Sequence, residues 1–167
     1  MRLCVFTVFA LLLLLGCQAD QPVGEQYPDQ MGYISFDPSK DSSAFQLCDE
    51  ADLVHSRTSL SYEGGRARIV ELSRRAFAEY SSDIDFTGYV MAHFLVNCKG
   101  KIGRLRIDAM DDAFIEKEAP EALINLIDKS VRQLDAWIVS RPANEGKDHS
   151  KYLNFKIVNG QIDAITH

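Results

Sequence analysis

The chain has 167 residues and a mass of 18.8 kDa, which is the size of about one domain. Hydrophobic residues make up 46% of it and charged residues 25%, an ordinary globular composition that excludes a disordered, collagen-like or low-complexity chain. The formal net charge of −6 argues against the basic field that general nucleic-acid binding requires. The composition therefore predicts one globular domain with an apolar core and no nucleic acid among its partners.

The N-terminus has the pattern of an export signal. Residues from Leu3 to Leu15 are almost entirely apolar and follow a single Arg2. About 13 residues at about 1.5 Å each are too short to cross a hydrocarbon core of about 30 Å, so this run is not expected to span a membrane. The apolar run ends in Leu-Leu-Gly followed by Cys17, without the small-x-small site of an ordinary secretory cleavage.

This ending resembles the lipobox of bacterial lipoproteins, in which the cysteine is acylated and becomes the first mature residue. The resemblance implies a signal peptide over residues 1–16, lipidation of Cys17 and attachment to a membrane through the lipid anchor. An ordinary signal peptide with an incidental cysteine, or a short buried helix, is the alternative. Gln18 resembles a sorting signal for the outer membrane, so we expect a protein of the bacterial cell envelope that faces the periplasm.

Export leaves two cysteines in the mature fold, because Cys4 departs with the signal and Cys17 carries the lipid. Cys48 and Cys98 then lie in an oxidising compartment, where a pair forms a disulfide more readily than a metal site. We predict that disulfide, and two free buried thiols are the alternative. Closing a loop of about 50 residues would stabilise the fold by about 4 kcal/mol.

Residues 17–44, which begin with the lipidated cysteine, have no sustained hydrophobic period. Their scattered Gly, Ser, Pro and Asp predict a flexible tether with at most a docked strand around Tyr33 to Phe36. The globular domain is expected over residues 45–167. Its first clear element is a helix from Arg68 to Tyr80, in which apolar residues recur at three-to-four spacing.

A hairpin and a second helix follow. Gly88 to Cys98 and Lys101 to Ala109 are β-rich runs joined by a two-residue link that contains glycine. Alternation in the second run turns Arg104 and Arg106 away from the buried face. The helix has a proline in its first turn and an apolar stripe that would lie on the sheet, formed by Leu123, Ile127, Val131, Leu134 and Trp137 or Ile138.

A second hairpin closes the chain. Lys151 to Val158 alternates between apolar and polar residues, and the Asn-Gly pair after it is typical of a type I′ turn that leads into Gln161 to Ile165. The order helix, strand, strand, helix, strand, strand predicts an α+β fold. We expect an antiparallel sheet of three to four strands with two helices packed on one face.

The chain contains no motif that points to catalysis. It lacks a Gly-x-Ser-x-Gly elbow, a Gly-rich phosphate loop before a helix and a His-Glu-x-x-His pair. A metal site would have to be assembled from distant segments, because no two of the histidines are closely spaced: His55, His93, His149 and His167. Asp111 and Asp112 are interpreted as a solvated turn. We therefore expect no enzyme, no metal and no cofactor.

The region between about Arg66 and Ile165 follows the pattern of one known family. Its elements are a strand, a turn that contains glycine, a second strand, a helix that ends at tryptophan, and a final strand. The matching positions are Gly88, Val90, Phe94, Val96, Gly100, Trp137, Tyr152, Phe155 and Ile157. This stretch resembles the C-terminal domain family of the energy transducer TonB. The resemblance implies that fold, and binding of a short extended peptide of an outer-membrane receptor by strand addition. The expected binding edge is Lys151, Tyr152, Asn154 and Lys156.

The chain also departs from the transducers. A cleaved signal and a short tether replace their membrane-spanning helix and long Pro-rich segment, so force transmission is not expected. The strand Gln161 to Ile165 is placed to cover the edge of Lys151 to Val158, and a covered edge cannot accept a peptide.

The sequence thus predicts a membrane-anchored, non-enzymatic periplasmic binding module. Its expected partner is an envelope protein or a TonB-dependent-type receptor. The alternative is a structural or assembly lipoprotein of the cell envelope that contacts another component through a surface patch of His93, Arg104 and Arg106. The sequence leaves the oligomeric state open.

Overall fold

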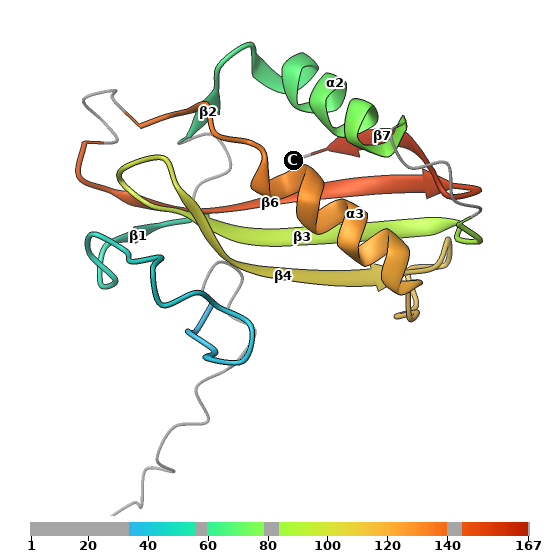
Figure 1. Ribbon diagram of the computed structural model, residues 1–167, viewed down its shortest axis with the longest axis horizontal. Coiled ribbons are helices and arrows are strands. Elements are labelled where there is room, and N and C mark those ends of the chain that lie inside the picture. The colour runs from blue at the N-terminus through green and yellow to red at the C-terminus, as the bar shows by residue number, and fades with distance from the viewer. Residues whose placement is uncertain (1–33, 56–59, 79–83, 140–144, 167) are drawn as a thin grey trace, which may run out of the picture.

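The computed structural model describes residues 34–55, 60–78, 84–139 and 145–166. The expected signal peptide and Cys17 therefore lie outside the described residues, as do Tyr80 and His167. Within these ranges the fold is α+β, with two helices, a mixed sheet of five strands and a separate two-stranded ribbon (Figure 1). None of the described helices is long and apolar enough to cross a membrane.

The larger sheet is built around its longest strand, β6. The strand order is β1, β6, β3, β4, and β7 also pairs with β6, while β2 and β5 form the ribbon. Only β1 runs parallel to its neighbour. In chain order the elements are β1 (Leu53–Val54), β2 (Ser61–Tyr62), α2 (Gly65–Ala78), β3 (Gly88–Val96), β4 (Ile102–Met110), α3 (Glu121–Arg132), β5 (Trp137–Ile138), β6 (Asp148–Val158) and β7 (Gln161–Thr166).

Both predicted hairpins are confirmed. β3 pairs antiparallel with β4, and β6 pairs antiparallel with β7. Asn159 and Gly160 have φ of 49° and 74°, the left-handed values that a type I′ turn needs at both central positions. The prediction of a purely antiparallel sheet of three to four strands is wrong, because β1 adds a parallel fifth strand. A two-residue strand is too short to show a period in the sequence.

The two helices cover one face of the sheet, as predicted, and the apolar core lies between these layers (Figure 1). Phe86, Phe94 and Phe155 are almost completely buried there. The helix α3 ends earlier than predicted, so Trp137 does not lie on it. Instead Trp137 belongs to β5, where its ring packs edge-on against Tyr62 with ring centroids 5.1 Å apart.

The other face of the sheet is partly covered by residues 34–50, which we call the N-terminal strap. Ile34 at its start is buried, and the Phe45 ring sits against Gly103 of β4, where a Cβ atom would lie 2.1 Å from the ring. The expectation of a flexible tether up to residue 44 is therefore wrong for residues 34–44, which pack on the sheet. No strand forms at residues 34–36 of the predicted docked segment.

Candidate functional site

The predicted binding edge lies inside the sheet. β3 pairs with one side of β6 from His149 to Ile157, and β7 pairs with the other side from Asn154 to Val158. Asn154 and Lys156 are thus enclosed between two strands. The structure contradicts an open edge at these positions, because the Asn-Gly turn folds β7 directly back onto β6.

The two remaining residues of that predicted edge pair with β3 on one side of β6, and the pairing of β7 on the other side begins only at Asn154. Lys151 is 5% exposed, and its Nζ donates a hydrogen bond of 3.3 Å to the carbonyl oxygen of Leu60. Burial lowers the pKa of Lys151. Tyr152 is half-buried and lies opposite His93 in the β3–β6 pair. Because β7 covers Asn154 and Lys156, the predicted edge of Lys151, Tyr152, Asn154 and Lys156 is not open as a whole.

The predicted surface patch is covered by the N-terminal strap. Arg104 is only 8% exposed, because its guanidinium donates to the carbonyl oxygen of Ile34 at 3.1 Å and forms an ion pair with Glu50. Arg106 donates to both carboxylate oxygens of Asp41, at 2.8 and 2.7 Å. The alternation of β4 does turn these arginines away from the helices, but the exposure expected for them is wrong because the strap packs on them.

The contact between the strap and β4 shifts the pKa values of the two groups that form it, Asp41 and Arg106. The hydrogen bond from Arg106 lowers the pKa of Asp41, and the same bond raises the pKa of Arg106. His93, the third residue of the predicted patch, has its pKa lowered chiefly by burial. These charges are used within the fold and do not form a free basic surface.

His93 and Ser150 form a hydrogen-bonded pair on the same face of the sheet. The Nε2 atom of His93 lies 2.8 Å from the Oγ atom of Ser150. A hydroxyl that is hydrogen-bonded to an imidazole is the first requirement of a nucleophilic pair. Ser150 is only 5% exposed, and neither residue lines the two surface hollows described below. We therefore interpret this pair as a link between β3 and β6.

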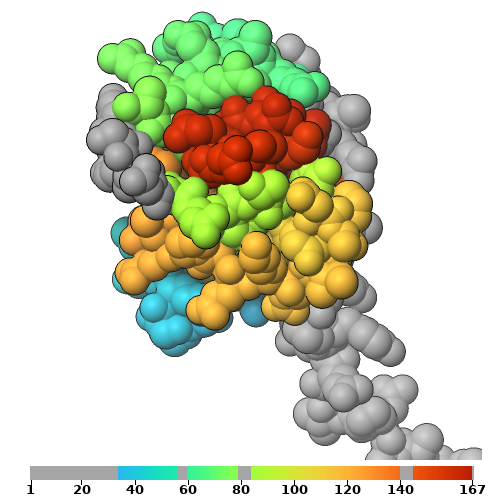
Figure 2. All heavy atoms as spheres, turned by 90° about the vertical axis from the view of Figure 1, so that its right-hand side faces the viewer, coloured from blue at the N-terminus to red at the C-terminus, as the bar shows by residue number. Residues whose placement is uncertain are grey.

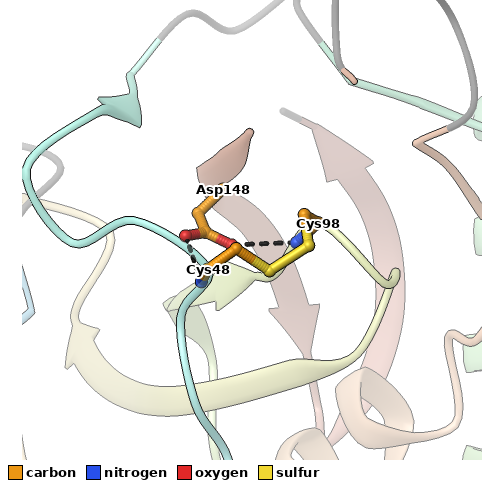
Figure 3. Close-up of side chains that lie close together, drawn as sticks. All are labelled: Cys48, Cys98 and Asp148. Carbon is orange, nitrogen blue, oxygen red and sulfur yellow. Dashed lines mark hydrogen bonds between the residues drawn. A yellow bond between two sulfur atoms is a disulfide. The ribbon is translucent and has the colours of Figure 1, made fainter. Parts of the chain in front are cut away.

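The predicted disulfide between Cys48 and Cys98 is present, and it fastens the end of the strap to the turn after β3 (Figure 3). The fully buried carboxylate of Asp148 lies beside it. One of its oxygens accepts the backbone N–H groups of Cys48 and Asp49, at 2.7 and 2.8 Å, and the other accepts that of Cys98 at 2.8 Å. Asp148 thus joins the same two segments that the disulfide joins.

This cluster does not fit a metal ion. Ligand atoms of Cys48, Cys98 and Asp148 lie within 4.8 Å of one another. However, cysteine binds metals as a thiolate, and here the two sulfur atoms are bonded to each other. Both carboxylate oxygens of Asp148 already accept hydrogen bonds from the backbone. We interpret the cluster as a structural junction.

The outer side of β4 is a margin of the sheet that no other named strand covers (Figure 1). Lys117 donates its backbone N–H to the carbonyl oxygen of Ala109 at 3.0 Å, so the polar backbone groups of Ala109 point away from β3. Backbone direction alternates along a strand, and Ile107 therefore also directs its N–H and carbonyl groups outward. The chain's own Lys117 already lies opposite Ala109, so Ile107 is the residue of this part of β4 that offers main-chain hydrogen bonds to another strand.

A hollow of about 540 Å³ borders this edge. Its lining combines apolar residues with four acidic residues and one lysine. The apolar residues are Ile107, Ala109, Ala119 and Ile124, and the charged ones are Asp108, Glu116, Glu118, Glu121 and Lys117. We call this hollow the β4 groove. None of the four carboxylates takes part in an ion pair within the part of the chain that the structure describes. The β4 groove is therefore an unneutralised acidic site.

A rigid loop presents two large apolar side chains next to the groove. Oδ1 of Asp111 accepts the backbone N–H groups of Ala113 and Ile115, at 2.8 and 3.0 Å. Phe114 and Ile115 are 68% and 64% exposed, and Phe114 has a φ of 60°, a strained conformation for a bulky residue. Figure 2 shows residues of this loop, in yellow to orange, at the surface of this end of the molecule.

The loop is held against the sheet by an aromatic contact. The ring of Phe114 stacks on Tyr89 of β3, with centroids 4.9 Å apart and an angle of 17° between the ring planes. Asp111 forms the turn that the sequence predicted for it. The β4 groove and the loop beside it were not predicted from the sequence. The sequence does contain a signal for the loop, because the apolar pair Phe114 and Ile115 interrupts an otherwise acidic run.

A second hollow, of about 390 Å³, lies near the start of β4. It is lined by strap residues that include Phe45, and by Asn97, Lys99 and Lys101 around the β3–β4 turn. The Asn97 side chain is engaged there, because it donates to the carbonyl oxygen of Gln46 at 2.9 Å. Its lining groups thus serve the attachment of the strap.

Comparison of the chain with protein-family models, with curated proteins and with solved structures gives no match. The likeness to the TonB C-terminal domain family therefore remains an expectation from the residues quoted above.

Proposed function

We propose that this chain is an exported, lipid-anchored and non-enzymatic binding module of the bacterial cell envelope. It recognises an extended segment of another envelope protein by adding that segment as a strand to the outer edge of β4. The observation that carries the proposal is the outward-facing backbone of Ile107, which lies beside the β4 groove. Main-chain hydrogen bonds then give affinity, and a neighbouring groove selects side chains.

The N-terminal sequence and the disulfide support the part of the proposal that concerns location. The apolar run before Cys17 resembles the export and lipidation signal of a bacterial lipoprotein. The bond between Cys48 and Cys98 is typical of proteins that fold in an oxidising compartment such as the periplasm. A lipid anchor in the outer membrane, with the domain in the periplasm, is consistent with both features.

The resemblance to TonB C-terminal domains supports a peptide partner, and it keeps a TonB-dependent-type receptor among the candidates. The chain differs at the edge that the resemblance implied, because β7 covers β6 there. The proposal therefore moves the site across the sheet to β4. This change keeps strand addition as the mode of binding and replaces the residues that perform it.

Photo-crosslinking of the full chain in its own cell envelope tests this proposal. Phe114 is replaced by p-benzoyl-phenylalanine, and a control chain carries the same group at Arg75, which is exposed on α2. We expect the Phe114 position to crosslink to one contiguous segment of an envelope protein, identified by mass spectrometry, and the Arg75 position not to do so. Equal crosslinking from both positions, or none from Phe114, would contradict a binding site at β4.

A further inference from the structure

We infer that the segment accepted by β4 is basic, with Lys or Arg alternating with apolar residues; this inference rests on the function proposed above. The β4 groove combines three features that select such a segment. These are an outward-facing strand backbone at Ile107, a group of carboxylates without ion pairs, and apolar residues that line the same hollow. Each feature limits the partner in a different way.

The negative charge of the groove favours a partner with positive charge. Asp108, Glu116, Glu118 and Glu121 are all exposed, and Lys117 is the one cation among the residues that line the hollow. The Nζ atom of Lys117 also lies 5.1 Å from the centre of the Phe86 ring, where it interacts with the aromatic face. Carboxylates without ion pairs favour a cationic partner, and like charges in an acidic segment would be repelled.

The apolar lining favours long basic side chains over other cations. Lys and Arg lay their methylene stems along apolar surface and keep the charged group in water. Ile107, Ala119 and Ile124 line the same hollow as the four carboxylates, which suits such side chains. In an added strand, every second side chain points to the same face of the sheet, so alternate residues would enter the groove.

The open edge is short, and this makes the charges important for affinity. At one end the chain after β4 occupies it, because Lys117 already bonds to Ala109. At the other end Arg104 has a φ of 48° at an irregularity in the β3–β4 register, which interrupts regular pairing. A segment can therefore make only a few main-chain hydrogen bonds here, and its charged side chains must supply much of the affinity. Binding should weaken as salt is raised.

Fluorescence anisotropy with synthetic peptides and the full-length protein in neutral detergent tests the inference. The probe is a labelled peptide of about eight residues in which Lys and Val alternate, compared with a peptide in which Glu replaces Lys. We expect the Lys peptide to bind at least about tenfold more tightly than the Glu peptide at low salt. We also expect a Pro in place of a central Val to weaken binding, because Pro cannot donate to a strand ladder.

Two charge variants test whether the carboxylates of the β4 groove cause the tighter binding of the Lys peptide. The variant Asp108→Asn/Glu116→Gln/Glu118→Gln should raise the Kd of the Lys peptide by about tenfold or more. Its matched control, Glu63→Gln/Glu71→Gln/Glu145→Gln, removes the same net charge from exposed positions that do not line the groove. The control should change the Kd by less than about twofold, since distant surface charges are screened by salt. Unchanged unfolding midpoints for both variants show that the fold is intact.

The outcomes separate this inference from the proposed function. The inference is wrong if the Glu peptide binds as well as the Lys peptide, or if the control variant weakens binding as much as the groove variant. If Phe114 crosslinks to an acidic or uncharged segment, the inference fails while binding at β4 stands. If Phe114 crosslinks to nothing and neither peptide binds, both proposals fail.

Discussion

Asp148 shows how one buried side chain can connect distant parts of the chain. Its carboxylate accepts three backbone N–H groups, two from the strap end at Cys48 and Asp49 and one from Cys98. An asparagine in its place has one acceptor oxygen, and its NH₂ group would face a backbone donor. At least one buried N–H would lose its partner.

We therefore predict that Asp148→Asn lowers the free energy of unfolding by about 2–4 kcal/mol. Urea unfolding of the purified protein measures this change as a lower midpoint at an unchanged slope. The control is Asp163→Asn, because Asp163 is exposed and its ion pair with Lys156 lies at the surface. Exposed pairs contribute at most about 1 kcal/mol. Equal losses from the two variants would show that Asp148 has no special role.

His93 makes stability depend on pH. Burial lowers its pKa below the ordinary value of about 6.5, and the positive charges of His55 and Arg106 act in the same direction, while Asp108 opposes them. The unfolded chain therefore binds more protons than the folded chain below that pH, so acidification favours unfolding. We predict that the free energy of unfolding falls as the pH drops below about 6.5.

The variant His93→Gln should reduce this dependence, since glutamine cannot gain the proton and can still bond to Ser150. Urea midpoints measured between about pH 7 and pH 5 provide the comparison. His149, whose pKa burial also lowers, leaves a residual slope in the variant. A slope that is unchanged by His93→Gln would contradict the assignment.

Among the structural elements, the strap covers part of the polar face of the sheet. It is attached by the disulfide, by the ion pairs of Arg104 and Arg106, and by the contact of Phe45 with Gly103. The disulfide closes a loop of 50 residues in the unfolded chain. Since the other contacts do not involve the two sulfur atoms, we expect them to hold the strap when the disulfide is removed.

We predict that Cys48→Ser/Cys98→Ser lowers the free energy of unfolding by up to about 4 kcal/mol. In the variant, amide hydrogens near Cys48 and Cys98 should exchange faster, while those of β3 and β6 keep most of their protection. Hydrogen exchange with mass spectrometry resolves the two regions. Loss of protection throughout β3 and β6 would show instead that the disulfide holds the whole fold together.

The elements that the sequence predicted are those with a local signal. Alternation together with a glycine turn identified both hairpins, and three-to-four spacing identified α2 and α3. Trp137 continued the apolar spacing of α3, yet its place is decided by pairing with Tyr62, 75 residues earlier in the chain. No local pattern reports such a pairing, and this is also why β1, β2 and β5 were not predicted.

The same reasoning explains what was missed at the site. Alternation gave the correct side of the sheet for Arg104 and Arg106, but exposure depends on the strap, whose contacts are about 65 to 70 residues away in sequence. The edge of β4 could not be recognised because a margin exists only once strand order is known. The closing of β6 by β7 was foreseen from the Asn-Gly turn, and it excluded the edge implied by the resemblance.

For the whole molecule, the strand order leaves two margins of the sheet: the outer side of β4, and the outer sides of β1 and β7 beyond β6. The helices cover one face, the strap covers part of the other, and β1 and β7 each pair with part of the outer side of β6. The outer side of β4 is the margin that has the acidic β4 groove and the Phe114 loop beside it (Figures 1 and 2). A protein with a net charge of −6 gathers four unneutralised carboxylates at this margin.

Amide hydrogen exchange on β4 with and without the Lys-Val peptide tests the central claim most directly. The account predicts that the backbone N–H group of Ile107 gains protection when peptide is added, while the exposed surface of α2 does not change. Protection confined to another strand, or binding with no gain at Ile107, would contradict strand addition at β4.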